Sequence, residues 1–303
     1  MTVVERKAAR ADVGAEYVVR PLRDRQEIRG LLEERRAYAA YALGQLDPVL
    51  FRMSEWWKAD GESSHAIVLH SRGGLGNATF AMGETDALEA ILRLHPGPRH
   101  TFLTCEVHQL DVLQRYFELE QRQTMIRMLV TPEMFVPAVP VPALRRLVGS
   151  DAREINLLYR TDGVPSFYSP RQIDESVYFG AERDGQLISI AGTHVISASS
   201  GISVVGNVYT HPRYRGQHLA QAVTSAVTER LLAACKEVVL SVDPTNVAAV
   251  RAYERLGYRE VARLVEGAAA RRDTTGIVSA ARRFAARTRG RGAGGELVRI
   301  RTP

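Results

Sequence analysis

The chain has 303 residues, 45% of them hydrophobic and 24% charged, which is the composition of a soluble globular protein with room for two domains. No apolar run approaches the ~20 residues that a membrane-spanning helix needs, and the first residues lack the order of a secretory signal. The two cysteines, Cys105 and Cys235, lie far apart and without metal-ligand spacing. We therefore expect a cytoplasmic protein with neither a disulfide framework nor a metal site.

The formal net charge of +6 is distributed unevenly along the chain. Residues 267–303 contain nine arginines against Asp273 and Glu296, a net charge of +7, so residues 1–266 sum to about −1. The segment 267–303 is predicted to be a basic, flexible tail, with an edge strand over 297–300 as the alternative. Because the folded body is near neutral, nucleic acid is not an expected partner except through this tail.

The first half of the chain alternates between the two kinds of hydrophobic period. Residues 1–14 show no clear period and predict a loose start. Helical spacing over 26–46 is followed by Asp47-Pro48, which would end a helix. Such alternation indicates helices that cover a mixed sheet. Strands are predicted at 17–22, 55–58, 66–70, 78–82, 101–107 and 124–130, and further helices at 85–94 and 110–118.

A proline-rich stretch over 136–142 fits neither a central strand nor a helix interior, so it predicts an extended linker. The same order of elements then begins again. This repetition indicates a divergent duplication, with one domain over 15–135 and another over 143–266; chance similarity between two α/β domains is the alternative. Strands are predicted at 143–148, 177–182, 187–196, 203–210, 237–242 and 258–265, and helices at 151–159, 171–176, 216–235 and 247–256.

The most informative segment runs from Val208 to Ala220 and joins an apolar strand to a helix through a turn that contains Gly216. A helix N-terminus leaves its leading amides unpaired and carries partial positive charge, so it suits an anion such as a pyrophosphate. Gly216 lacks a Cβ and lets a ligand approach the backbone closely. The segment therefore predicts an anion-binding turn.

Two motifs in this region resemble those of the GCN5-related N-acetyltransferases, the GNAT family. Arg213-Tyr214-Arg215-Gly216-Gln217-His218 is similar to the acyl-CoA-binding motif Q/R-x-x-G-x-G/A, which it matches at the first and fourth positions. It departs at the sixth position, where His218 replaces glycine or alanine. The stretch 239–258 resembles the later family segment N-x-x-A-x-x-x-Y-x-x-x-G-F/Y, with Asn246, Ala249, Tyr253, Gly257 and Tyr258 in register.

The resemblance implies tandem GNAT-like domains of the α+β class, each a mixed, mainly antiparallel β-sheet flanked by α-helices. The domain over 143–266 would bind acyl-CoA, and its style is similar to the FR47-like and glycine-acyltransferase-like branch. The domain over 15–135 has no counterpart of the Arg-Gly-Gln turn. It is therefore expected to be a degenerate GNAT-like domain that has lost its cofactor site.

The resemblance also implies roles for single residues. Backbone groups of Val208, Tyr209 and Thr210 would pair with the pantetheine arm of acetyl-CoA, or of another acyl-CoA, and Asn246 would bond to the same region. Tyr253 would protonate the departing thiolate or stabilise it. The pyrophosphate would be held by the turn and the first helical residues, which are Arg215, Gly216, Gln217, His218, Leu219, Ala220 and Gln221.

The implied reaction is direct transfer of an acetyl or other short acyl group from acyl-CoA to a primary amine on a small molecule or a protein. The alternative is a non-catalytic acyl-CoA-binding protein, which His218 and Ser241 favour. Ser241 stands where some relatives carry a glutamate base. Glu182, Asp243 and His194 are nearby in sequence, but nothing selects one of them as the base.

Two further questions stay open at this stage. Asn246 could cap the helix that follows it, a common role for asparagine, as well as bind the cofactor. The oligomeric state is expected to be a monomer or a homodimer, because a near-neutral body with a duplicated fold can be self-sufficient.

Overall fold

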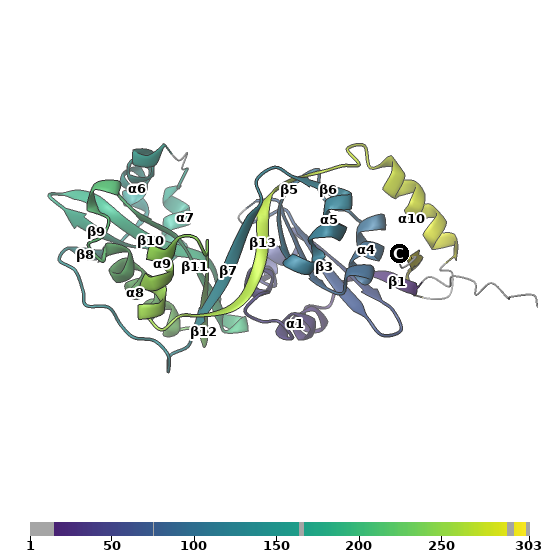
Figure 1. Ribbon diagram of the computed structural model, residues 1–303, viewed down its shortest axis with the longest axis horizontal. Coiled ribbons are helices and arrows are strands. Elements are labelled where there is room, and N and C mark those ends of the chain that lie inside the picture. Colours follow the sequence, from purple (N-terminus) through teal and green to yellow (C-terminus); the bar gives the residue numbers. More distant parts are fainter. Residues whose placement is uncertain (1–14, 75, 164–166, 290–293, 301–303) are drawn as a thin grey trace, which may run out of the picture.

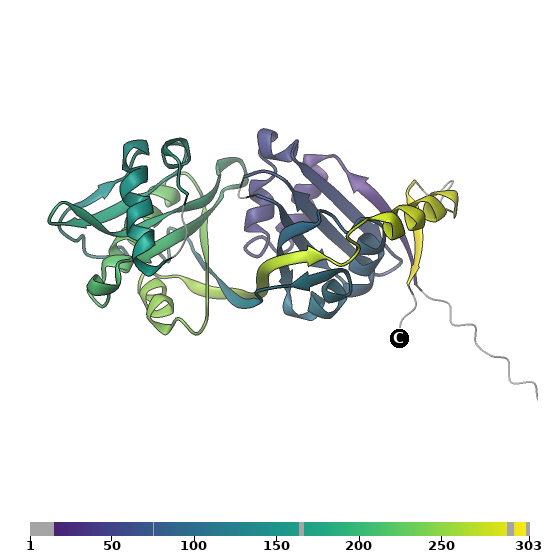
Figure 2. The same cartoon turned by 90° about the horizontal axis from the view of Figure 1, so that it is seen from above.

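The computed structural model describes residues 15–74, 76–163, 167–289 and 294–300. The predicted loose start over 1–14 lies outside them. One continuous sheet of fourteen strands connects two lobes that lie side by side along the long axis of the molecule (Figures 1 and 2). Among the described residues, no helix has the length and apolar character required to cross a bilayer.

The N-terminal lobe comprises residues 15–119 together with 272–300. Its chain begins with the strands β1 (Ala15–Leu22), β2 (Ser54–Asp60), β3 (His65–Ser71), β4 (Ala78–Gly83), β5 (His100–Glu106) and β6 (Phe117–Leu119) and the helices α1 (Arg25–Glu33), α2 (Ala40–Gly44), α3 (Pro48–Phe51), α4 (Thr85–Leu94) and α5 (Leu110–Tyr116). Its last elements are α10 (Ile277–Arg289) and β14 (Glu296–Ile300).

The C-terminal lobe comprises residues 144–255. It contains the strands β8 (Leu144–Arg146), β9 (Phe179–Arg183), β10 (Gln186–Ser197), β11 (Ile202–Thr210) and β12 (Glu237–Val242) and the helices α6 (Ala152–Tyr159), α7 (Pro170–Asp174), α8 (Leu219–Leu232) and α9 (Val247–Arg255). Strands pair antiparallel throughout the sheet, except that β4 pairs parallel to β5 and β11 parallel to β12. The predicted mixed, mainly antiparallel α+β fold is confirmed.

Two strands are exchanged between the lobes. β7 (Gln123–Val130) ends the first half of the sequence, but it pairs with β12 of the C-terminal lobe, where Arg127 lies opposite Ser241. β13 (Arg259–Arg271) ends the second half, but it pairs with β5 of the N-terminal lobe and runs from one lobe into the other (Figure 1). β7 and β13 also pair with each other. The domain boundaries predicted from the sequence therefore do not coincide with a break in the sheet, which continues from one lobe to the other.

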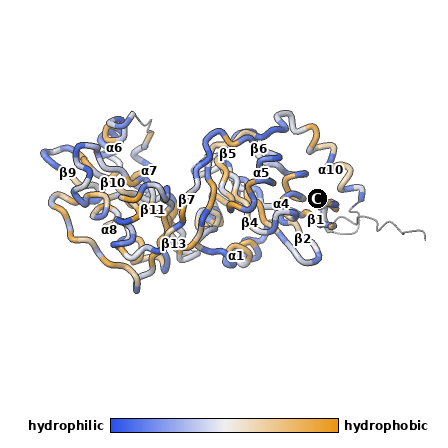
Figure 3. The backbone as a smooth tube through the Cα atoms, viewed as in Figure 1, coloured by the Kyte–Doolittle hydropathy of each residue, from blue (hydrophilic) through white to orange (hydrophobic). Residues whose placement is uncertain are grey.

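The lobes also share a hydrophobic core. Leu32 and Leu43 from α1 and α2 belong to the same buried cluster as Val204 and Val239 from β11 and β12. Burial of such side chains contributes about 1.5–3 kcal/mol each, so this cluster holds the lobes in a fixed arrangement. Apolar residues follow the strands of both lobes (Figure 3).

Two predicted helices have different bounds in the structure. The helix predicted over 26–46 is broken, because residues 34–39 form turns from which Arg35 contacts Glu106 and Arg36 contacts Glu237. These tertiary contacts override the helical period. The helix predicted over 216–235 begins only at Leu219, because Gly216 and His218 have positive φ angles.

The predicted flexible tail over 267–303 is wrong where the structure describes it. Residues up to Arg271 continue β13, α10 follows, and β14 pairs with β1, as the alternative edge strand over 297–300 proposed. The arginines of this segment are used for docking, since Arg283 donates to the carbonyl of Leu94 and Arg271 to that of Gly97. Glu296 accepts from His95 and Arg287 at the end of the segment.

Candidate functional site

A cleft of about 1230 Å³ lies where the two lobes meet. β11 and β12 stay paired only as far as Val205 and Leu240, and beyond that point the two strands diverge. The cleft begins in this gap and continues to β4 and β5 of the N-terminal lobe. Both lobes therefore contribute side chains to it.

The turn before α8 forms one end of the cleft. Gly216 has a φ angle of 79° and His218 one of 58°. The backbone is therefore left-handed at both residues before the helix begins at Leu219. The first regular hydrogen bond of the helix joins Ala222 N to His218 O at 3.1 Å. The amides of Leu219 to Gln221 come before that bond, so they are available to an anion. A Cβ on Gly216 would meet open space, so the turn faces a free volume.

The structure brings nearly all the predicted cofactor residues to this cleft. Those that line it are Val208, Tyr209, Thr210, Arg215, Gly216, His218, Leu219, Ala220, Gln221, Asn246 and Tyr253. Gln217 is exposed and is the one predicted residue that does not line it. The Arg215 guanidinium group is already paired, at 2.5 Å from Asp162 Oδ2, and it also donates to the carbonyl of Thr210.

Tyr253 and Asn246 lie on α9 and at its start. The Tyr253 side chain is only 6% exposed, and burial raises the pKa of its phenol to about 12. Among the described residues its hydroxyl has no hydrogen-bond partner, so it is a free donor at the cleft wall. Asn246 caps α9, since its Oδ1 accepts from Ala249 N at 3.2 Å. The capping role proposed for Asn246 is confirmed, and its side-chain amide is left to face the cleft.

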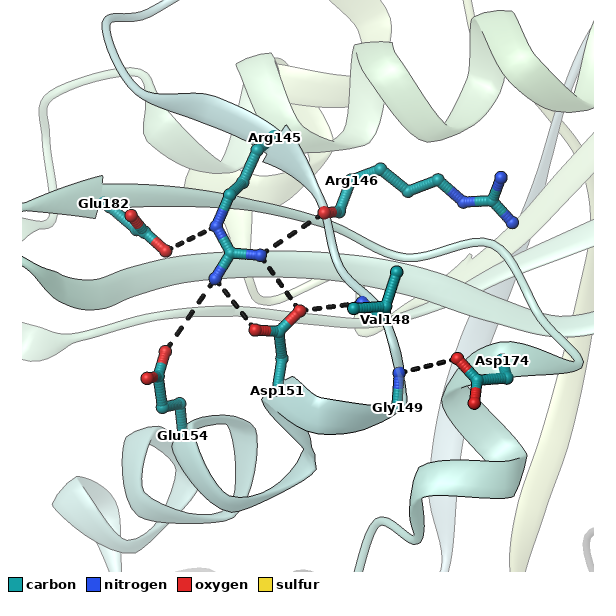
Figure 4. A network of polar contacts seen from close by, with 8 residues as sticks. All are labelled: Arg145, Arg146, Val148, Gly149, Asp151, Glu154, Asp174 and Glu182. Atoms are coloured by element: carbon teal, nitrogen blue, oxygen red, sulfur yellow. Dashed lines mark hydrogen bonds and ion pairs between the residues drawn. The ribbon is translucent and has the colours of Figure 1, made fainter.

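Two of the three acids and bases considered from the sequence are unsuited to act as a base here. Glu182 pairs with Arg145 at 2.6 Å in a network on the outer side of the C-terminal lobe (Figure 4). Asp243 lines the cleft, but it accepts from the amide and hydroxyl of Thr245, and these bonds lower the pKa of its carboxyl.

His194, the third of them, also lines the cleft. Its Nδ1 is 2.6 Å from the hydroxyl of Tyr41, and its Nε2 is 3.0 Å from Oδ1 of Asn207. Asn207 sits in β11 with a φ angle of 55°, where its carbonyl accepts from Tyr159 at 2.7 Å. Burial lowers the pKa of His194, so the imidazole is neutral near pH 7.

Beneath the cleft lies a fully buried cation, Arg127 on β7. Its guanidinium group donates to the hydroxyl of Ser241, lies 5.1 Å from the ring centre of Tyr41, and is 3.6 Å from the carboxylate of Glu266. Nε and Nη2 of Arg127 have no hydrogen-bond partner. Burial raises the pKa of Glu266. Ser241, Tyr41 and Glu266 all line the cleft, so Arg127 contacts three of its lining residues.

The matching position in the N-terminal lobe is filled by protein. β4 and β5 diverge beyond Phe80 and Thr104, as β11 and β12 do in the other lobe. In the gap, Tyr38 donates to the carbonyl of Ala81 at 2.6 Å, and Gln109 donates to that of Gly83 at 2.7 Å. Backbone groups that could receive a ligand are therefore already bonded.

Several cleft residues were not found from the sequence. Tyr41 and Glu266, and Arg127 beneath them, belong to elements that are far apart in the chain. The packing of α2 on β10 and β11 and the strand exchange bring them together. The nearest signal was Gly206-Asn207 inside a strand, because glycine in a strand often marks a bulge or a close approach. A Cβ on Gly206 would come within 2.3 Å of the His194 ring, so glycine is needed there.

Known proteins resemble this chain in the region of the cleft. Residues 150–258 match the model of the acetyltransferase (GNAT) family. A segment of 90 residues is 38% identical to a mycothiol acetyltransferase from Thermobispora bispora and covers 28% of this chain. It spans only 30% of the length of that relative.

Two solved structures match most of the chain. A GCN5-related N-acetyltransferase from Kribbella flavida covers 78% of this chain and 95% of its own, with a TM-score of 0.54 and 17% identity. A GCN5-related N-acetyltransferase from Sphaerobacter thermophilus covers 83% of this chain and 95% of its own, with a TM-score of 0.52 and 16% identity. At such identities the likeness concerns the fold alone. The chain therefore has the GNAT fold, and its residues 150–258 are similar to the acetyltransferase (GNAT) family.

Proposed function

We propose that the protein is an N-acetyltransferase that moves an acetyl or other short acyl group from acyl-CoA to a primary amine. One observation carries the proposal: a single cleft is lined by the anion-binding turn, by the diverging end of β11 and by the free hydroxyl of Tyr253. These are the groups needed for the pyrophosphate, the pantetheine arm and the sulfur of acyl-CoA. We also propose, from the resemblance, that the chain belongs to the FR47-like and glycine-acyltransferase-like branch.

The pyrophosphate would lie on the amides of Leu219 to Gln221 at the start of α8. Arg251 and Arg255, one turn apart on α9, also line the cleft and would add positive charge near the phosphates. The pantetheine arm would pair with backbone groups of Val208 to Thr210, beyond the point where β11 leaves β12. The amide of Asn246 would bond to the same arm.

The chemistry would be one direct substitution. The lone pair of the neutral amine attacks the thioester carbonyl carbon, the C–N bond forms and the C–S bond breaks. Tyr253 would give its proton to the departing thiolate, for which a phenol that stays protonated at neutral pH is suited. Much of the acceleration would come from holding amine and thioester together.

Calorimetric titration with acetyl-CoA tests the cofactor site. We expect micromolar binding by the wild type and loss of binding in Gly216→Glu, because the side chain places bulk and negative charge in the turn. Gly185→Glu is a matched control. Gly185 also has a positive φ angle (74°) and open space at its Cβ, but it lies in the β9–β10 hairpin away from the cleft.

A panel of primary amines with acetyl-CoA then tests catalysis. The panel should contain an amino acid, an amino sugar, a polyamine and a lysine peptide, because the cleft does not define the acceptor. Binding of acetyl-CoA without acetylation of any amine would favour the alternative, a non-catalytic acyl-CoA-binding protein. If a well-folded wild type bound no acyl-CoA of any length, the enzyme proposal would be wrong.

A further inference from the structure

The N-terminal lobe supplies a tyrosine to the cleft of the C-terminal lobe. Tyr41 lies on α2, which packs directly on β10 and β11. The approach is close, since a Cβ on Gly44 would come within 2.5 Å of Val195 on β10. Ala40 and Ala42 are likewise fully buried. The short side chains of α2 therefore fix the position of Tyr41 at the cleft.

The hydrogen bonds around His194 define which ring nitrogen carries the proton. Asn207 Nδ2 donates to the hydroxyl of Tyr178 at 2.9 Å, so Asn207 presents its oxygen to His194 Nε2. An oxygen acceptor requires that Nε2 carries the hydrogen. Nδ1 of the neutral ring is then an acceptor, and Tyr41 donates its hydroxyl proton to it at 2.6 Å. Tyr41 therefore donates a hydrogen bond to His194, and His194 donates one to Asn207.

From this arrangement we infer that Tyr41 and His194 form the proton relay that deprotonates the attacking amine, with Tyr41 in contact with the amine and His194 behind it. The inference rests on the proposed function. His194 cannot itself meet the substrate through a ring nitrogen, because both nitrogens are bonded to protein. Tyr41 lines the cleft, and its hydroxyl oxygen, which donates to His194, can also accept a proton.

The step balances with a single proton and no change of oxidation state. The amine nitrogen gives its proton to Tyr41 Oη while the hydroxyl proton of Tyr41 passes to His194 Nδ1. His194 becomes an imidazolium, and its Nε2–H remains bonded to Asn207. The amine keeps the electron pair that forms the new C–N bond. After the product leaves, His194 gives its proton to solvent and the Tyr253 phenolate takes one up, so both groups return to their starting states.

Charged and titratable groups from each neighbouring element face this pair. Arg127 of β7 lies 5.1 Å from the Tyr41 ring and favours partial negative charge on its oxygen, whereas Glu266 of β13 opposes it. Arg127 also opposes a charge on His194, in the same direction as burial. Tyr178 faces the pair only through Asn207. His194 therefore stays neutral, and able to accept, down to a pH below its usual pKa.

Tyr41→Phe and His194→Gln test the relay, with the amine of the panel that the wild type acetylates fastest. For each variant we expect kcat to fall about 100-fold, with an unchanged Kd for acetyl-CoA. The double variant should be no slower than either single variant, because the two groups act as one unit. The acidic limb of the wild-type pH profile, in which the rate falls as His194 becomes protonated, should be absent in His194→Gln.

Tyr38→Phe is the matched control, because it removes a buried hydroxyl next to the same helix without touching the relay. We expect it to keep the wild-type kcat and pH profile. Nitrogen-15 spectra should also show His194 protonated at Nε2 at neutral pH. An active wild type together with a Tyr41→Phe variant of normal kcat and pH profile would overturn the relay alone. If no amine is acetylated by the wild type, the proposed function and the relay fail together.

Discussion

The guanidinium group of Arg127, on the exchanged strand β7, lies 5.1 Å from the ring centre of Tyr41, on α2 of the N-terminal lobe. Arg127 is fully buried, and its nearest carboxylate, Glu266, comes from the exchanged strand β13. The pair is 3.6 Å apart, so it is an ion pair without a hydrogen bond between its members. A buried cation without full pairing is costly, and this one contacts three residues that line the cleft.

Arg127→Met should destabilise the protein by about 3–5 kcal/mol, because it leaves the Glu266 carboxylate buried without a counter-charge. The double variant with Glu266→Gln should recover most of that loss, since no charge is then left unpaired. Urea unfolding of the two single variants and the double variant measures the coupling. Equal losses in Arg127→Met with and without Glu266→Gln would mean that the two groups do not interact.

Tyr253→Phe should lower kcat about 100-fold with little change in acetyl-CoA binding, because the phenol acts on the leaving thiolate. The proton of Tyr253 is lost only as the pH rises through about 12, so kcat should show no alkaline fall from this group below about pH 11. Absorbance titration at ~295 nm, compared with Tyr253→Phe, reports the phenolate. A phenolate that forms near pH 10 would contradict the prediction.

The control for Tyr253 is Tyr258→Phe. Its ring lies 6.1 Å from that of Tyr253, but its hydroxyl bonds to Thr228 in the core and not to the cleft. We expect this variant to be less stable, because Thr228 loses a buried partner, and to keep its kcat.

His218→Gly should stabilise the protein by about 0.5–1 kcal/mol, since a left-handed conformation is strained for histidine and free for glycine. The side chain is exposed, so little packing is lost. Acetyl-CoA should bind at least as tightly as to the wild type, because the turn amides are unchanged. Asp184→Gly, at a φ angle of 53° in the β9–β10 hairpin, should give a similar gain in urea unfolding without any effect on binding. A loss of stability in His218→Gly would show that the imidazole holds the turn.

Local patterns were sufficient to predict most of the elements and one side of the cleft. The turn at Gly216, the cap at Asn246 and the tyrosine on α9 lie within 40 residues of one another, and their geometry follows from helix ends and strand order. The positive φ angle of His218 also explains why glycine suits this position, which the sequence motif alone does not reveal.

The other side of the cleft depends on contacts that no local pattern encodes. Tyr41 and His194 are 153 residues apart and meet because α2 packs on the sheet of the other lobe. In the sequence, Arg127 is only a polar residue within a predicted strand. Its partners lie on two strands that follow it by more than 100 residues. The prediction of a flexible C-terminal tail was wrong for a similar reason. The arginines of this segment bond to carbonyl groups of the N-terminal lobe, which composition does not show.

The exchanged strands also constrain how the chain can fold during synthesis. When residues 123–130 leave the ribosome, neither neighbour of β7 exists yet, because β12 and β13 are made more than 100 residues later. β7 therefore has no strand partner until residues 237–271 are made. Its side chains that are buried in the folded protein stay exposed until then; they are Ile126, Met128 and Val130. In the N-terminal lobe, β5 has β4 on one side but lacks β13 on the other until residue 271 is made. Neither lobe can therefore close first, and premature termination anywhere before β13 leaves open sheet edges that invite aggregation.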